Sequence, residues 1–164
     1  MVVTSNTLPM KKANQSLIKI KDLRAKTKAG VLDCRSALEE CGGDLKKAEE
    51  WLKKKGIASA KKRTDREVKA GLVEAYTHAD SRVASVVELG CETDFVARTD
   101  DFKTLAHELA LQVAAMNPKN VKELLSQTYI RDDKMTIENL VKQAIGKLGE
   151  NIKIRHIYRC QLGE

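Results

Sequence analysis

Phe95 stands beside Asp94 in the run Glu92-Thr93-Asp94-Phe95-Val96-Ala97-Arg98, and the whole chain of 164 residues contains only two phenylalanines. A surface Phe that inserts into an apolar cleft of another protein would recover roughly 1.5–3 kcal/mol, which changes a competing equilibrium by about one to two powers of ten. Asp94 would add a charged hydrogen-bond acceptor that fixes the angle of insertion. If the ring is exposed, the pair is a candidate wedge that acts on a partner protein. In the alternative, Phe95 anchors the next helix in the chain's own core, since most Phe side chains are buried.

The sequence lacks the motifs of common enzymes. It contains no Gly-x-x-x-x-Gly-Lys-Ser/Thr phosphate loop and no Gly-x-Ser-x-Gly nucleophile motif. His78, His107 and His156 are far apart in the sequence and lack the spacing of zinc ligands. The four cysteines match neither metal knuckles nor a redox Cys-x-x-Cys pair. We therefore predict a protein that is not an enzyme, binds no nucleotide directly and needs neither a metal nor a cofactor.

Composition favours a small helical protein with a light core. The chain is 42% hydrophobic but only 4% aromatic, so a core must be built from Leu, Ile, Val and Ala. No apolar run approaches the roughly 20 residues needed to span a bilayer. The polar residues 1–16 lack the apolar stretch of a secretory signal. We expect the cysteines to be reduced, mostly buried thiols of an intracellular protein.

Charge is distributed unevenly along the chain. Residues 1–70 carry 18 Lys and Arg against 9 Asp and Glu, a net charge of +9, whereas residues 71–164 carry 12 against 14, a net charge of −2. The basic excess suggests that the front part meets an acidic protein surface or RNA. A merely solvated helix surface explains the same excess equally well.

The front part of the chain predicts three short helices. The first spans 17–27, and the second carries an apolar stripe at helical spacing made of Val31, Cys34, Leu38 and Cys41. Asp44 is placed to cap the third helix, which should end at Gly56. We therefore expect a flexible tail over 1–16, a three-helix module over 17–56, and a helical or extended linker over 57–70 with little to bury.

The remaining residues, 71–164, predict an α+β core domain. Alternating residues over 71–89 indicate a hairpin of two strands. Helical spacing indicates a helix over 102–116 capped by Thr99, a short turn over 120–125, and a helix over 137–148 capped by Thr136. A third strand over 152–162 should complete a three-stranded antiparallel sheet packed with helices. Such a small sheet must bury its apolar face against helices or a second copy of the chain.

Two groups of residues resemble the signatures of the elongation factor Ts family. The first group comprises Leu23, Arg24, Thr27, Asp33, Cys34, Ala37 and Leu38. The second is the run from Glu92 to Arg98. The likeness covers nearly the whole chain from Leu17 to Glu164, and the short interval between Pro118 and Ile152 resembles the short form of the family.

The resemblance implies a guanine nucleotide exchange factor of translation elongation. Thr93, Asp94, Phe95 and Val96 would enter the nucleotide-binding domain of elongation factor Tu, where the Phe95 ring parts two helices and disturbs the magnesium and phosphate contacts, so that GDP leaves and GTP can rebind. The three-helix module is similar to ubiquitin-associated domains. Its candidate contacts to the same domain are Arg24, Thr27 and Val31.

The resemblance also bears on assembly and location. Short forms can dimerise through their sheets, so the family implies a homodimer and a complex of two copies with two copies of elongation factor Tu. We expect the bacterial cytoplasm as the location, with an organelle as the alternative, and no membrane association.

Two other functions compete with this interpretation. A non-catalytic adaptor would bind protein ligands through the small helical module without affecting nucleotide release. An RNA-associated protein would use the basic front half, and its affinity would fall steeply with salt. The low aromatic content and the lack of base-stacking motifs weigh against RNA.

Overall fold

The computed structural model describes residues 8–27, 29–60 and 63–164. Contacts within the chain divide it into two compact units, Met1–Lys55 and Gly56–Glu164. The first is helical, and the second combines helices with an antiparallel sheet. The α+β class expected from the sequence is therefore confirmed.

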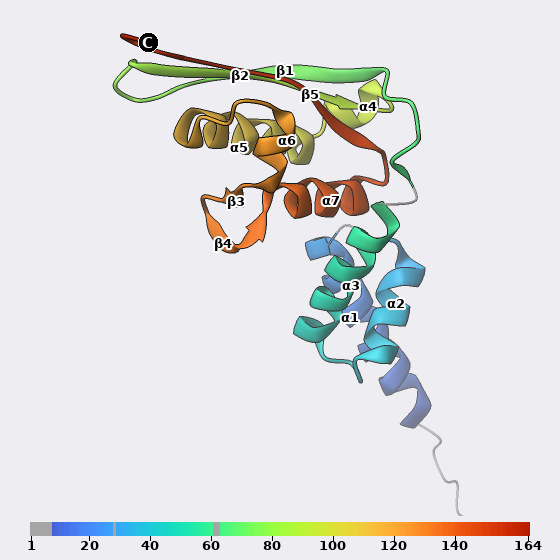
Figure 1. Cartoon of the computed structure of the whole chain (residues 1–164). Helices are drawn as coiled ribbons and strands as arrows, with labels where there is room; N and C mark the ends of the chain where they lie inside the picture. Colours follow the sequence, from blue (N-terminus) through green and yellow to red (C-terminus); the bar gives the residue numbers. More distant parts are fainter. Residues whose placement is uncertain (1–7, 28, 61–62) are drawn as a thin grey trace, which may run out of the picture. The chain divides into compact units, whose positions relative to one another are not determined.

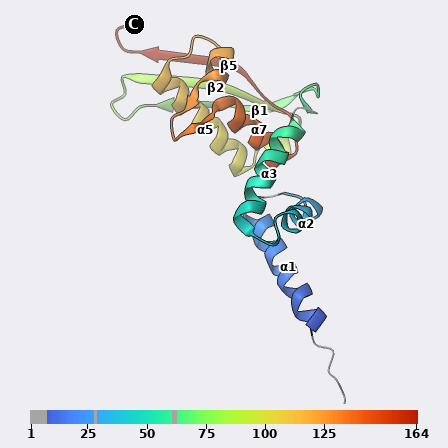
Figure 2. The same cartoon turned by 60° about the horizontal axis from the view of Figure 1, so that its bottom comes forward.

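The first unit is built from α1 (Leu8–Thr27), α2 (Val31–Glu40) and the greater part of α3 (Leu45–Ala60), which lie against one another in Figure 2. Its core consists of Leu23, Cys34, Ala37, Leu38, Ala48 and Leu52. These small and aliphatic side chains make a thin core, as the low aromatic content predicts.

Asp44 caps α3 as expected. Its Oδ1 atom accepts hydrogen bonds from the backbone N–H groups of Lys46 at 2.9 Å and Lys47 at 3.2 Å. These bonds favour the charged carboxylate and lower the pKa of Asp44. The chain reversal between α2 and α3 is thus encoded locally.

Three boundaries differ from the expected ones. Helix α1 begins at Leu8, so residues 8–16 of the expected tail are helical, while 1–7 lie outside the described residues. Helix α3 continues through Gly56 to Ala60, because one glycine costs a helix interior only about 1 kcal/mol relative to alanine. Buried Ala60 and Val68 show that the expected linker contributes to the core of the second unit. Lys61 and Lys62 lie outside the described residues.

The second unit contains the three-stranded sheet with strand order β1-β2-β5 and antiparallel pairing throughout. The strands are β1 (Ala70–Thr77), β2 (Val83–Cys91) and β5 (Ile152–Gln161). Register pairs Ala70 with Cys91, and a bulge in the pairing of β2 with β5 falls between Glu88 and Leu89. Both the expected hairpin and the closing strand are confirmed.

Helices α5 (Asp100–Met116) and α6 (Val121–Ser126) lie against one face of this sheet, and α7 (Ile137–Leu148) lies on the same side, farther from the strands, as Figure 1 shows. The Oγ1 atoms of Thr99 and Thr136 cap α5 and α7, as the sequence predicts. Asn117 and Gly149 end these helices in the left-handed region. The core between the layers is aliphatic around Phe102.

The sequence does not predict the small hairpin formed by β3 (Thr128–Tyr129) and β4 (Asp132–Thr136). Buried Gln112 on α5 holds it, since Nε2 donates to the Thr128 carbonyl at 3.0 Å and Oε1 accepts from the Ile130 N–H at 3.0 Å. The pairing is too short and polar to leave an alternating pattern. Its position depends on these tertiary contacts.

Candidate partner-binding site

The run from Glu92 to Arg98 forms a short helix, α4 (Asp94–Ala97), directly after β2. Thr93 is extended at φ −128° and ψ 157° and caps the helix, with its Oγ1 atom facing the Val96 N–H at 3.5 Å. Ala97 is buried, and Val96 packs partly against the core. The helix is therefore attached to the protein along the side that carries Val96 and Ala97.

Phe95 occupies the free side of α4, where 80% of it is exposed. The alternative in which Phe95 anchors the following helix in the core is therefore wrong. Phe102, in the first turn of α5, is completely buried and has that role. A large apolar side chain on a supported helix can enter an apolar cleft of another molecule.

Asp94 lies at the start of α4 with its carboxylate near the surface. Its Oδ2 atom accepts a hydrogen bond from Arg98 at 2.8 Å, and both side chains are more than half exposed. A pair this exposed contributes little to stability. Asp94 can therefore exchange Arg98 for a donor of a partner at small cost.

A polar framework on the other side of Thr93 comes from the turn between α7 and β5, which the sequence did not single out. The Glu150 carboxylate accepts two hydrogen bonds from Thr93, at 2.6 Å from Oγ1 and at 3.0 Å from the backbone N–H. The backbone N–H of Asn151 donates to Glu92 Oε1 at 2.6 Å. Glu150 lies 57 positions after Thr93 and Asn151 lies 59 positions after Glu92, so no local pattern could have revealed the contacts.

Cys91 closes the base of the site. Its Sγ atom lies 3.0 Å from the carbonyl oxygen of Thr93, to which the thiol donates. Burial raises the pKa of this thiol, and the nearby Glu150 carboxylate raises it further. The side chain is thus a neutral, buried packing group. Of the four cysteines, Cys34 is also buried, Cys41 is half-buried and Cys160 is exposed.

The three candidate residues of the first unit have different surroundings. Arg24 is exposed on α1. The Oγ1 atom of Thr27 donates to the Leu23 carbonyl at 2.7 Å and accepts from the Ala29 N–H at 3.3 Å, so this side chain organises the end of α1. Val31, expected on the buried stripe, is 49% exposed at the start of α2, beside Leu32 at 77%. The sequence did not single out Leu32.

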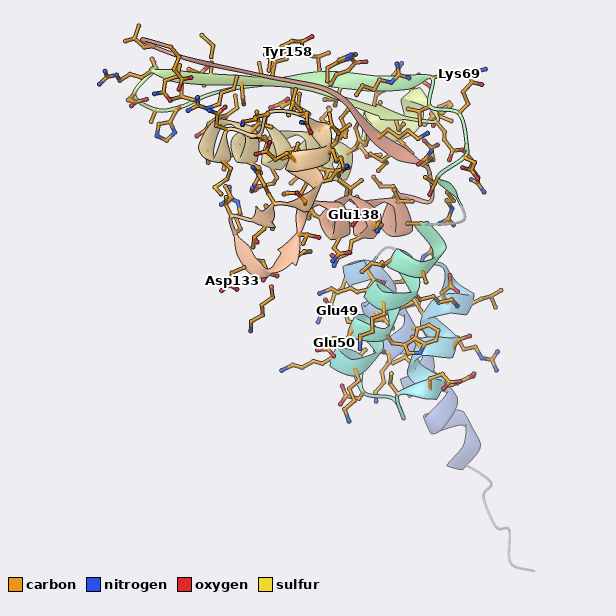
Figure 3. The ribbon with its side chains drawn as sticks, viewed as in Figure 1. Glu49, Glu50, Lys69, Asp133, Glu138 and Tyr158 are labelled. Atoms are coloured by element: carbon orange, nitrogen blue, oxygen red, sulfur yellow. The ribbon has the colours of Figure 1, made fainter. Side chains whose placement is uncertain are left out.

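A second apolar surface lies on the face of the sheet opposite the helices. The register places Val86 of β2 between Ala75 of β1 and Tyr158 of β5. Val73 and Tyr158 are each 66% exposed, and Figure 3 shows Tyr158 on the side of the sheet away from the helices. We call Val73, Ala75, Val86 and Tyr158 the outer sheet face.

His78 and His107 both pack against the ring of Tyr76, and His107 and His156 have different carboxylate partners. His107 Nδ1 lies 3.0 Å from Glu74 Oε1, and His156 Nδ1 lies 2.7 Å from Glu88 Oε2. Within the described ranges, no group of three or more His, Cys, Asp or Glu side chains could hold a metal ion. No described helix is long and apolar enough to cross a membrane.

Comparison with known proteins identifies the family. A sequence model of the family described as "Elongation factor TS" matches residues 92–164, which begin at the run that carries Phe95. The protein named "Elongation factor Ts" from Synechocystis sp. is 42% identical over 191 residues, covering 88% of this chain and 88% of the relative. The chain belongs to the elongation factor Ts family. It is therefore an elongation factor of protein biosynthesis.

Other members of the family show similar identity. The elongation factor Ts of Coprothermobacter proteolyticus is 41% identical over 190 residues, covering 88% of this chain and 96% of that protein. That of Prochlorococcus marinus (strain AS9601) is 42% identical over 191 residues. Because 88% of this chain is about 144 residues, about 47 of these 191 aligned positions have no counterpart here. This family member is thus shorter inside the aligned region than these relatives.

Proposed function

We propose that this member of the elongation factor Ts family is a guanine nucleotide exchange factor that acts on elongation factor Tu. Thr93, Asp94, Phe95 and Val96 enter the nucleotide-binding domain of elongation factor Tu, where the Phe95 ring displaces the magnesium and phosphate contacts of GDP. GDP then leaves, and GTP can bind. The factor performs no covalent step and binds no nucleotide itself.

The exposure of Phe95 on α4 is the observation that carries this proposal. The ring is 80% exposed although its neighbours Val96 and Ala97 are attached to the core. Burial of the ring in a partner would release roughly 1.5–3 kcal/mol, which corresponds to about one to two powers of ten in an equilibrium constant. The helix that carries the ring is already ordered, so less of this free energy is spent on ordering the site.

Exchange then follows from thermodynamic linkage. A partner that binds either the factor or the nucleotide well, but both together poorly, releases each more easily when the other binds. Burial of the Phe95 ring would supply binding free energy to the complex of the factor with elongation factor Tu. Asp94, released from Arg98, would accept a hydrogen bond from the partner and orient the ring.

The first unit supplies a second contact in this proposal. We infer that its three helices form a module like the ubiquitin-associated domain and that Arg24 and Val31 touch the same nucleotide-binding domain. Both side chains are exposed. Thr27 would act indirectly, because its hydroxyl group is engaged in holding the end of α1.

We also infer a homodimer formed through the outer sheet face, which would place two factors and two copies of elongation factor Tu in one complex. The outer sheet face is apolar at Val73, Ala75, Val86 and Tyr158, and exposed apolar patches of this kind mark interaction surfaces. We infer the bacterial cytoplasm as the location, since the relatives named above come from bacteria.

A stopped-flow experiment tests the exchange function. Elongation factor Tu loaded with fluorescent GDP is mixed with excess unlabelled GDP and either the parent factor, Phe95→Ala or Met116→Ala. Met116 is 49% exposed at the end of α5 and provides the matched control for loss of an exposed apolar side chain. We expect fast release with the parent and the control, and release about tenfold or more slower with Phe95→Ala.

The other outcomes are equally informative. Equal rates with the parent and Phe95→Ala would contradict the wedge. Binding of elongation factor Tu or another protein without any acceleration would favour the adaptor function instead.

A further inference from the structure

We propose that Glu150 is a positioning residue that holds the Phe95 helix in the orientation required for insertion. The proposal rests on the proposed role of Phe95. Glu150 belongs to the turn between α7 and β5, far from the run of residues 92–98 in the sequence. It acts on Phe95 through Thr93.

The two hydrogen bonds from Thr93 use both oxygens of the Glu150 carboxylate. Oε1 accepts from the Thr93 hydroxyl group at 2.6 Å, and Oε2 accepts from the Thr93 backbone N–H at 3.0 Å. A carboxylate that accepts from both a side chain and the backbone of one residue fixes that residue in position and rotation. Thr93 is the N-cap residue of α4.

The geometry also determines which way the Thr93 hydroxyl group points. A hydroxyl group has one proton to donate, and here Glu150 receives it. The lone pairs of the same oxygen are then free to face the N–H of Val96 at 3.5 Å, in the first turn of α4. Glu150 therefore favours the rotamer of Thr93 that caps the helix.

Glu150 is itself held by its neighbours. Gly149 precedes it at φ 80° as the cap of α7. Asn151 follows it and is only 1% exposed. The Nδ2 atom of Asn151 donates to the carbonyls of Thr64 at 3.1 Å and Arg66 at 2.8 Å. The turn is thus anchored on both sides, and the carboxylate is presented to Thr93 from a fixed base.

A helix as short as α4 needs such external support. It spans four residues, which is too few for a stable helix in water without tertiary contacts. At its far end, the Thr99 hydroxyl group donates to the Val96 carbonyl at 2.8 Å. At its near end, Glu150 and Thr93 provide the support. Loss of Glu150 would leave the first turn free to move, and a partner would then have to order Phe95 when it binds.

The presence of only two phenylalanines allows a direct test. The factor is prepared with 4-fluorophenylalanine, which places one fluorine label at Phe95 and one at buried Phe102. The ¹⁹F spectrum then reports separately on the helix that carries Phe95 and on the core, and the Phe95→Leu variant assigns the two signals.

The variants compared are Glu150→Ala, Glu150→Gln and Glu138→Ala. Glu138 is labelled on α7 in Figure 3 and pairs with Lys142 at 2.6 Å, so its loss removes an exposed glutamate from the neighbouring helix without touching Thr93. In Glu150→Ala we expect a shifted or broadened Phe95 signal and an unchanged Phe102 signal. The maximal rate of GDP release should fall about tenfold, with a smaller loss in Glu150→Gln, which keeps one acceptor oxygen. Glu138→Ala should match the parent in both measurements.

Several results would overturn the proposal. An unchanged Phe95 signal in Glu150→Ala would show that the carboxylate does not position the helix. A Phe102 signal that changes as much as the Phe95 signal would show a general structural role instead. If the parent itself does not accelerate GDP release, the exchange function fails, and the ¹⁹F comparison alone decides whether Glu150 orders Phe95.

Discussion

Phe95 and Phe102 lie seven residues apart and have opposite environments. Phe95 is 80% exposed on α4, whereas Phe102 is completely buried in the first turn of α5. Thr99 lies between α4 and α5 and bonds to both helices. Its Oγ1 atom accepts from the Phe102 N–H at 3.3 Å and donates to the Val96 carbonyl at 2.8 Å. The change from α4 to α5 at this residue leaves one ring outside the core and the other within it.

This difference predicts opposite effects on stability. Phe102→Ala should lower the free energy of unfolding by about 3–5 kcal/mol, because it removes a fully buried ring and leaves a cavity. Phe95→Ala should change it by less than about 0.5 kcal/mol. Urea denaturation followed by circular dichroism measures both. A large loss of stability in Phe95→Ala would show that the ring packs against its own protein.

Arg24 and Val31 test the contact proposed for the first unit. Substitution of either by Ala should raise the concentration of factor that gives the half-maximal rate of GDP release by about three- to tenfold, because an exposed contact is lost while Phe95 remains. Arg35→Ala provides the control, since Arg35 is exposed and pairs with Glu39 at 2.8 Å in the same helix. If Arg24→Ala and Val31→Ala behave like Arg35→Ala, the surface around them does not contact the partner.

Tyr158 tests the homodimer. Tyr158→Glu would place a charge on the outer sheet face, where it would be desolvated in a dimer. We expect sedimentation equilibrium to show a dimer for the parent and a monomer for this variant. Ile130→Glu, at a site 40% exposed in the connection between β3 and β4, should remain dimeric. A monomeric parent would contradict the proposed dimer.

Gly56 and Gly146 approach each other closely within the second unit. A Cβ atom at Gly146 would lie 2.6 Å from the Gly56 Cα atom, whereas a Cβ atom at Gly56 would lie 3.5 Å from the Gly146 Cα atom. Gly146→Ala should therefore lower the free energy of unfolding by about 1–3 kcal/mol. Gly56→Ala should be neutral or slightly stabilising, since alanine favours a helix. Thermal denaturation compares the two, and equal midpoints would contradict the asymmetry.

The anchor of the β3–β4 hairpin should depend on pH. Burial, together with a hydrogen bond to Glu108 at 2.7 Å, raises the pKa of Tyr129 to about 12. Burial alone would raise the pKa of Glu108, but hydrogen bonds from Arg131 and Tyr129 outweigh this effect and lower it. The hairpin is therefore held by neutral Tyr129 and charged Glu108. Asp133, labelled in Figure 3, marks the hairpin.

Tyr129 and Glu108 make the stability of the hairpin depend on pH in opposite directions. The stability from Tyr129 is complete below about pH 10 and is lost as the pH rises towards about 12. That from Glu108 is complete above about pH 4.3 and is lost as the pH falls through its lowered pKa. Ultraviolet titration of tyrosinate should show a step near pH 12 that disappears in Tyr129→Phe but remains in Tyr158→Phe. A step that survives Tyr129→Phe would contradict the assignment.

Elements with strong local patterns could be predicted from the sequence. Helical spacing and hydroxyl caps place α5 and α7, and alternation places the β1–β2 hairpin and β5. Asp44 caps α3 through two bonds to residues two and three positions on, so that turn too is local. The predicted helix start at Leu17 and helix end at Gly56 were wrong. Helix α1 begins at Leu8 and α3 ends at Ala60, because neither a polar stretch nor a single glycine forbids a helix.

By itself, the sequence determined the α+β class, the three-stranded sheet and the family signature around Asp94 and Phe95. Only the tertiary structure decided that Phe95 points outward while Val31 leaves its predicted stripe, because exposure depends on which neighbours are present in space. The contact of Glu150 with Thr93 joins residues 57 positions apart, and the hairpin held by Gln112 has strands too short to show a period. Such contacts arise from chain packing, which no local pattern of residue types records.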